Sequence, residues 1–158
     1  LYVGASGAWG RALFEKYGPL PEGVFEDLVL GFRAGLEGAA HFIDEPLVKY
    51  RADIGLSSTG AAFSTPAAWE KARMSRLNLY ERVFEARLKD AQTFGLPATS
   101  EVSKRLHAEI ADQSLRADLV NRPLSAALVR LPAHGLKALQ RWQSEKSRAR
   151  RALRRGPS

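Results

Sequence analysis

The chain of 158 residues contains no cysteine and only three histidines. Without cysteine there is no disulfide, no thiolate metal site and no cysteine nucleophile. The histidines are scattered at His41, His107 and His134, which argues against a zinc site built from several of them. No apolar run of about eighteen residues occurs, so no membrane-spanning segment is predicted. The sequence begins at Leu1, without a methionine or a signal segment, and we expect it to be a fragment that lacks its upstream part.

Charge is distributed unevenly along a sequence of otherwise globular composition, with 45% apolar and 26% charged residues. Residues 1–60 hold 5 Lys+Arg and 8 Asp+Glu, whereas residues 61–158 hold 19 and 9, which together give the net charge of +7. The excess is densest between Arg141 and Arg155, where seven basic residues are accompanied by one acid, Glu145. A local excess indicates a basic face or tail, and it disfavours nucleic acid as a partner of the whole chain.

Residues 1–60 predict short helices, turns and a strand. One helix is expected over about Arg11 to Tyr17, ended by Gly18-Pro19, and a second from Glu26-Asp27 to Gly38. The stretch from His41 to Arg51 is rich in strand-forming residues and is expected to be extended. Residues 52–65 are small and polar, which is typical of a loop.

Residues 61–158 predict helices only. Proline is favoured at the first helical position and glycine just after the end, so the pattern predicts one 29-residue helix from Pro66 to the residue before Gly95. A second helix is expected to be capped by Thr99 or Ser100 and to end before Pro123. A third helical stretch, broken at Pro132, runs into the basic tail.

Four blocks of residues between positions 4 and 58 carry a family resemblance. They are Gly4-Ala5-Ser6-Gly7-Ala8-Trp9, the run from Arg11 to Leu20, Phe25-Glu26-Asp27-Leu28-Val29-Leu30 with Phe32-Arg33-Ala34, and, after Gly38, Ile43-Asp44-Glu45-Pro46-Leu47-Val48-Lys49-Tyr50-Arg51. In order, spacing and residue type, the blocks resemble the C-terminal half of the catalytic domain of family-2 glycosyltransferases of the GT-A type. The resemblance implies an α/β fold, GT-A-like and partial, for residues 1–60, followed by an all-α extension over residues 61–158.

The resemblance also implies an activity. Such enzymes move a sugar from a nucleotide-sugar to a hydroxyl of a saccharide, lipid-linked or protein acceptor, usually with inversion, and a carboxylate takes the acceptor proton. That role falls on Asp27, with Glu26 positioning the acceptor or tuning its neighbour. Ala5, Ser6, Trp9 and Arg51 are the candidate substrate-binding residues.

The same resemblance implies a divalent cation, Mg²⁺ or Mn²⁺, at the leaving diphosphate. In the family this cation is held by an Asp-x-Asp motif, which is absent from these 158 residues. We therefore expect the metal to be bound mainly by the upstream half. Asp53 occupies the position where many relatives have a histidine, two residues after Arg51, and it is a candidate ligand because carboxylates bind hard cations.

Simpler interpretations exist for each of these residues. Acids such as Glu26 and Asp27 are favoured at a helix start by the helix dipole alone. Ser6 suits a turn, and Trp9 suits a core. Arg51 is able to pair with Asp44 or Glu45 at the surface.

The end of the chain offers an alternative function. Gln140-Arg141-Trp142 lacks the spacer of the Gln-x-x-Arg-Trp motif of processive synthases, so we expect a non-processive enzyme. A different class is a basic helical interaction module that binds an anionic membrane surface or nucleic acid. An imperfect apolar stripe on the basic tail favours membrane contact and is formed by Leu136, Leu139, Trp142, Ala149 and Leu153. The simpler interpretation of the tail is a solvated terminus that binds nothing. The expected location is cytoplasmic, with peripheral contact at the membrane surface.

Overall fold

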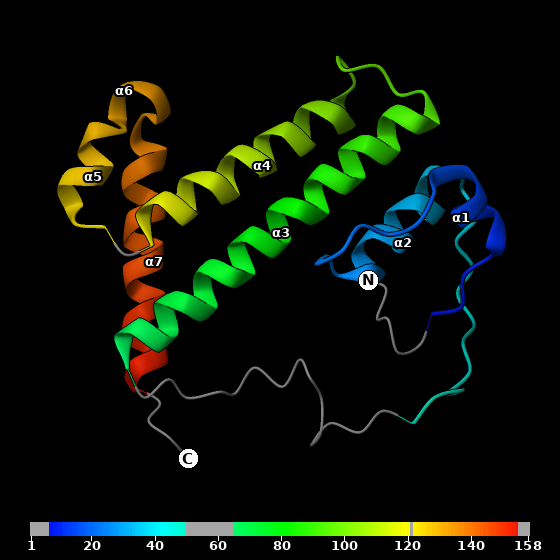
Figure 1. Ribbon diagram of the computed structural model, residues 1–158, viewed down its shortest axis with the longest axis horizontal. Helices are drawn as coiled ribbons and strands as arrows, with labels where there is room; N and C mark the ends of the chain where they lie inside the picture. The colour runs from blue at the N-terminus through cyan, green and yellow to red at the C-terminus, as the bar shows by residue number, and fades with distance from the viewer. Residues whose placement is uncertain (1–6, 50–64, 121, 155–158) are drawn as a thin grey trace. The chain divides into compact units, whose positions relative to one another are not determined.

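All regular secondary structure in the described part of the chain is helical (Figure 1). The computed structural model describes residues 7–49, 65–120 and 122–154. In chain order the helices are α1 (Arg11–Tyr17), α2 (Glu26–Leu36), α3 (Pro66–Phe94), α4 (Glu101–Leu119), α5 (Leu124–Val129), α6 (Leu131–His134) and α7 (Leu136–Arg154). The expected helices of residues 61–158 are therefore confirmed, and the third stretch is divided into α5, α6 and α7.

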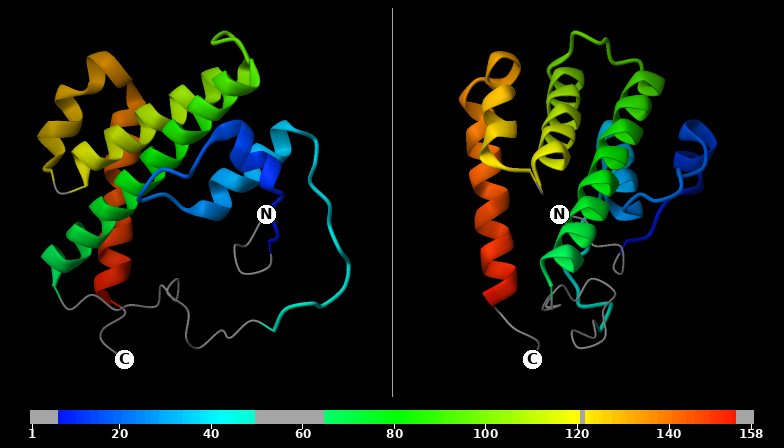
Figure 2. Two further views of the ribbon diagram at one scale, coloured as in Figure 1. Left: turned by 45° about the vertical axis from the view of Figure 1, so that its right-hand side comes forward. Right: turned by 60° about the vertical axis from the view of Figure 1, so that its left-hand side comes forward.

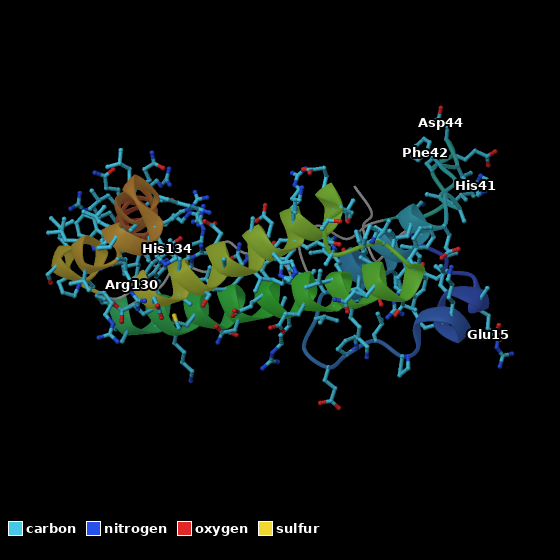
Figure 3. The ribbon with its side chains drawn as sticks, turned by 90° about the horizontal axis from the view of Figure 1, so that it is seen from above. Glu15, His41, Phe42, Asp44, Arg130 and His134 are labelled. Atoms are coloured by element: carbon cyan, nitrogen blue, oxygen red, sulfur yellow. The ribbon has the colours of Figure 1, made fainter. Side chains whose placement is uncertain are left out.

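The expectation of an α/β, GT-A-like domain in residues 1–60 is wrong for the residues that the structure describes, because none of them lies in a strand. The apolar stretch predicted to be extended has no paired backbone, and Phe42 and Ile43 are 87% and 62% exposed. Figure 3 shows His41, Phe42 and Asp44 on this stretch, which follows α2. A high strand propensity means only that the side chains of a segment fit a pleated sheet surface. A strand forms only when its backbone amides and carbonyls hydrogen-bond to those of a second strand.

Local capping explains the ends of the longest helix, α3. The Thr65 hydroxyl accepts a hydrogen bond from the Ala68 amide at 3.2 Å, and Pro66 occupies the first helical position. At the other end Gly95 has a φ of +98°, and the Leu96 amide donates to the Ala91 carbonyl at 2.9 Å. This left-handed glycine cap satisfies carbonyls that the helix leaves open.

The helices group into two compact units, which we call unit 1 and unit 2. Unit 1 contains α1, α2, residues 79–94 of α3 and residues 101–110 of α4. Unit 2 contains residues 66–78 of α3, residues 111–119 of α4, and α5 to α7. The predicted division of the chain into a domain part of residues 1–60 and an extension of residues 61–158 stays a prediction.

Unit 1 is built around apolar contacts of α2 with α3. Val29, Val83 and Ala86 form the buried cluster, and Leu20, Val24, Phe25, Leu28 and Leu79 pack against it. Beside this cluster, Arg33 of α2 is 2% exposed and pairs with Asp90 of α3.

Unit 2 packs α7 alongside α5 and α6, as Figure 2 shows. Trp69, Leu77 and Val120 form one buried cluster with Ala149 and Ala152 against it, while Leu139 and Trp142 pack against a second cluster of Leu115, Leu119 and Ala127. Three residues of the predicted membrane stripe, Leu139, Trp142 and Ala149, thus contribute to the interior of unit 2. The membrane contact predicted for the tail stays a prediction.

Candidate active site

The two predicted catalytic acids lie in the first turn of α2. The preceding N-cap residue, Phe25, supplies no side-chain hydrogen bond to this helix start. Glu26 is exposed, whereas Asp27 is half-buried. The Asp27 Oδ1 atom accepts a hydrogen bond from the Leu28 amide at 2.8 Å. Of the two acids, Asp27 is the one whose carboxylate the backbone holds in a defined position.

The loop that leads into α2 is held against α3. Gly23 has a φ of +68°, a left-handed conformation, and a Cβ atom there would lie 2.5 Å from the Nη1 atom of Arg82. Two residues later the Phe25 ring contacts the Tyr80 ring, with a centroid separation of 5.3 Å. These contacts fix the direction in which the chain enters α2, and therefore the place where Asp27 stands.

Arg87 reaches the same turn of α2 from α3. Its Nε and Nη2 atoms donate to the Leu28 carbonyl oxygen at 3.0 and 2.6 Å. Its guanidinium lies 5.5 Å from the ring centroid of Phe32 and 5.9 Å from that of Phe84. Burial lowers the pKa of Arg87, while the negative charge of Asp27 raises it. A cation therefore stands close to the candidate base.

The far end of α2 is anchored by Arg33. This guanidinium donates to both carboxylate oxygens of Asp90, at 2.8 and 3.1 Å, and to the Gly18 carbonyl at 2.9 Å. A second anchor joins α1 to the end of α2, where Lys16 donates to Glu37 at 2.6 Å and the Tyr17 hydroxyl donates to the same carboxylate oxygen. Burial, followed by this hydrogen bond to Glu37, raises the pKa of Tyr17. Helix α2 is thus fixed at both ends.

Sequence reasoning missed the structural roles of Arg33 in α2 and of its partner Asp90, and that of Arg87, which binds the first turn of α2. A signal for one of them was present, because Asp90 follows Val83 by seven residues and so falls on the apolar face of α3. A charged residue at a core position indicates a buried partner.

The remaining predicted site residues are not brought together by the described part of the structure. Trp9 is half-buried just before α1, where a Cβ atom added to Gly7 would lie 3.0 Å from its ring. Ala5, Ser6, Arg51 and Asp53 lie outside the described residues.

The described residues do not fit the divalent cation that the resemblance implies. Within residues 7–49, 65–120 and 122–154, no three histidine, aspartate or glutamate side chains form a group able to hold a metal ion. The buried carboxylates Asp90, Asp112 and Glu145 are instead bound by arginines.

Among the described helices, none combines the length and the apolar character needed to cross a bilayer. Comparison of the chain with known proteins finds no matching family model, no matching curated protein and no matching solved structure.

Proposed function

We propose that this chain carries the catalytic base of an inverting, non-processive glycosyltransferase and that Asp27 is that base. The observation that carries the proposal is the placement of Asp27. It is half-buried in the first turn of α2, with one carboxylate oxygen held by the Leu28 amide. A general base must present a carboxylate in a fixed position within reach of the proton that it takes.

Such a base serves a displacement reaction at the anomeric carbon of the donor sugar. An acceptor hydroxyl attacks the anomeric carbon of the donor sugar, and a new C–O bond forms as the bond to the diphosphate breaks. The nucleoside diphosphate leaves with the electron pair, and the hydroxyl proton passes to the Asp27 carboxylate. Attack from the side opposite the leaving group inverts the anomeric configuration. The family resemblance implies that the groups that stabilise the leaving diphosphate lie mainly upstream of these residues.

The role proposed for Glu26 is acceptor binding. Its carboxylate is exposed beside Asp27, at the same helix start. From there it is suited to accept hydrogen bonds from other hydroxyls of the acceptor. Its loss should weaken acceptor binding, seen as a higher KM, more than it lowers kcat.

The test is Asp27→Asn in the intact protein as its gene encodes it. The measurement is release of nucleoside diphosphate from a panel of UDP-, GDP- and dTDP-sugars, with Mg²⁺ or Mn²⁺ and with alkyl glycosides as acceptors. Asparagine keeps the size of the side chain but does not take up the proton, so kcat should fall by about 10²–10⁴. Binding of the donor, measured by calorimetry, should be retained.

A matched control is Glu15→Gln, which makes the same change of charge at an exposed acid of α1 (Figure 3), in a surface pair with Arg11. This variant should keep the activity of the wild type. Activity of Asp27→Asn within about twofold of the wild type, or no release from any donor by the wild type, would contradict the proposal.

A further inference from the structure

We infer that Arg87 of α3 is a positioning residue for Asp27, so that the long helix contributes to catalysis by fixing the base in place. This inference rests on the proposed function and deepens it. It assigns a catalytic purpose to residues 79–94, which lie outside the part of the sequence that carries the family resemblance.

The hydrogen bonds of Arg87 connect it to the residue that follows Asp27. Two nitrogens of one planar guanidinium converge on a single acceptor, the Leu28 carbonyl, at 3.0 and 2.6 Å. Leu28 is the residue directly after Asp27, and its amide is the donor to the Asp27 carboxylate. Arg87 therefore binds the carbonyl of Leu28, and Asp27 binds the amide of the same residue. A displacement of Arg87 would consequently move the residue that holds the Asp27 carboxylate.

Arg87 is itself held in place by two aromatic rings. Its guanidinium lies near the rings of Phe32 and Phe84, with centroid distances of 5.5 and 5.9 Å. Planar guanidinium groups interact favourably with aromatic faces, and such contacts restrict the rotamers of a long side chain. Lysine would keep the charge but would lose both the fork and the stacking.

Arg87 and Asp27 also interact through their opposite charges. Arg87 is half-buried, and burial opposes its positive charge, whereas the Asp27 carboxylate favours it. This electrostatic attraction adds to the hydrogen bonds by which Arg87 binds the turn of α2 that carries Asp27. Helix α3 brings this cation to the first turn of α2 within unit 1.

The experiment is a double-mutant cycle in the intact protein, with nucleotide release from the donor panel as the measurement. Arg87→Met should lower kcat by about 10–100-fold, the scale of loss that follows small misplacement of a catalytic group, with little change in the KM for the donor. Arg87→Lys should recover part of the loss. In the Asp27→Asn background, Arg87→Met should cause no further loss of rate, because the residue acts through Asp27.

The control is Lys89→Met, which removes an exposed cation from the same helix two residues away and should leave kcat unchanged. Far-UV circular dichroism and donor binding establish that each variant is folded.

Separate outcomes overturn the inference and the proposed function. If Asp27→Asn is inactive while Arg87→Met has wild-type activity, the inference is wrong and the proposed function stands. If the losses from Arg87→Met and Asp27→Asn multiply, Arg87 has a structural role independent of the base and the inference is wrong. If Asp27→Asn is as active as the wild type, the proposed function fails and the inference falls with it.

Discussion

Arg33 and Asp90 are 57 residues apart in the sequence and form a buried bidentate ion pair, with N–O distances of 2.8 and 3.1 Å. Their side chains are 2% and 3% exposed. Two backbone carbonyls, of Tyr17 and Gly18, also accept from the same guanidinium. The pair therefore joins α2 to α3 and also holds the end of α1.

Asp90→Asn should destabilise the chain strongly, because it leaves the Arg33 charge buried without its counter-ion. Loss of one partner of a buried pair costs about 3–5 kcal/mol of the free energy of unfolding. Urea denaturation followed by circular dichroism measures this change. The control is Glu85→Gln on the exposed side of α3, which should change stability by less than about 0.5 kcal/mol. A loss below about 1 kcal/mol in Asp90→Asn would show that water or another group compensates Arg33.

Two glycines at the end of α2 should respond to alanine in opposite directions. Gly38 has a φ of +63°, and its amide and that of Ala39 donate to the Gly35 and Ala34 carbonyls at 3.2 and 3.0 Å. Alanine is strained in that left-handed cap, so Gly38→Ala should cost about 1 kcal/mol. Gly35 lies inside α2 with open space around its Cβ position, so Gly35→Ala should stabilise by about 0.5–1 kcal/mol. Thermal denaturation checks both, and equal signs would contradict the assigned cap.

Acid should weaken unit 2 through Asp112. Burial alone would raise the pKa of the Asp112 carboxyl, but hydrogen bonds from Arg116, Arg141 and Lys137 outweigh it and lower the pKa from 3.8 to about 2. A carboxyl whose pKa is lower in the folded chain than in the unfolded chain stabilises the fold at pH values above the unfolded-state pKa. This stabilisation, about 2 kcal/mol, is lost as the pH falls from about 4 to about 2. The stability of Asp112→Asn, measured by urea denaturation from pH 5 to pH 2, should therefore fall less steeply than that of the wild type. Parallel curves would contradict this assignment.

Glu145 is the second carboxylate of unit 2 and has no exposed surface. Arg73 donates to it at 2.7 and 2.8 Å, Arg116 at 2.9 Å and Arg148 at 3.1 Å. Glu145→Gln keeps the shape but removes the charge that balances these arginines, and it should cost about 3–5 kcal/mol in urea denaturation. Glu109→Gln on α4, at a half-buried acid, is the matched comparison and should cost less than about 1 kcal/mol.

The helices could be predicted because their signals are local. Pro66 and Gly95 mark the ends of α3 by their own conformational preferences, which do not depend on distant residues. The strand predicted near Phe42 failed because pairing needs a second backbone. The role of Asp27 as a candidate base could be proposed from its motif. The role of Arg87 could not, because it depends on a contact with Leu28, 59 residues away in the sequence.

The Glu145 carboxylate has a consequence for the axial position of α7. On α7 the small side chains Ala138, Ala149 and Ala152 are buried or partly buried, and they restrict its axial position less than the larger Leu139 and Trp142 do. A slip by one helical turn, about 5.4 Å, would carry Glu145 away from Arg73 and Arg116 and would bring a cationic neighbour such as Arg141 or Arg148 toward them. Attraction would then become repulsion between like charges. The single acid of this strongly basic helix thus favours one axial position of α7 relative to Arg73 and Arg116.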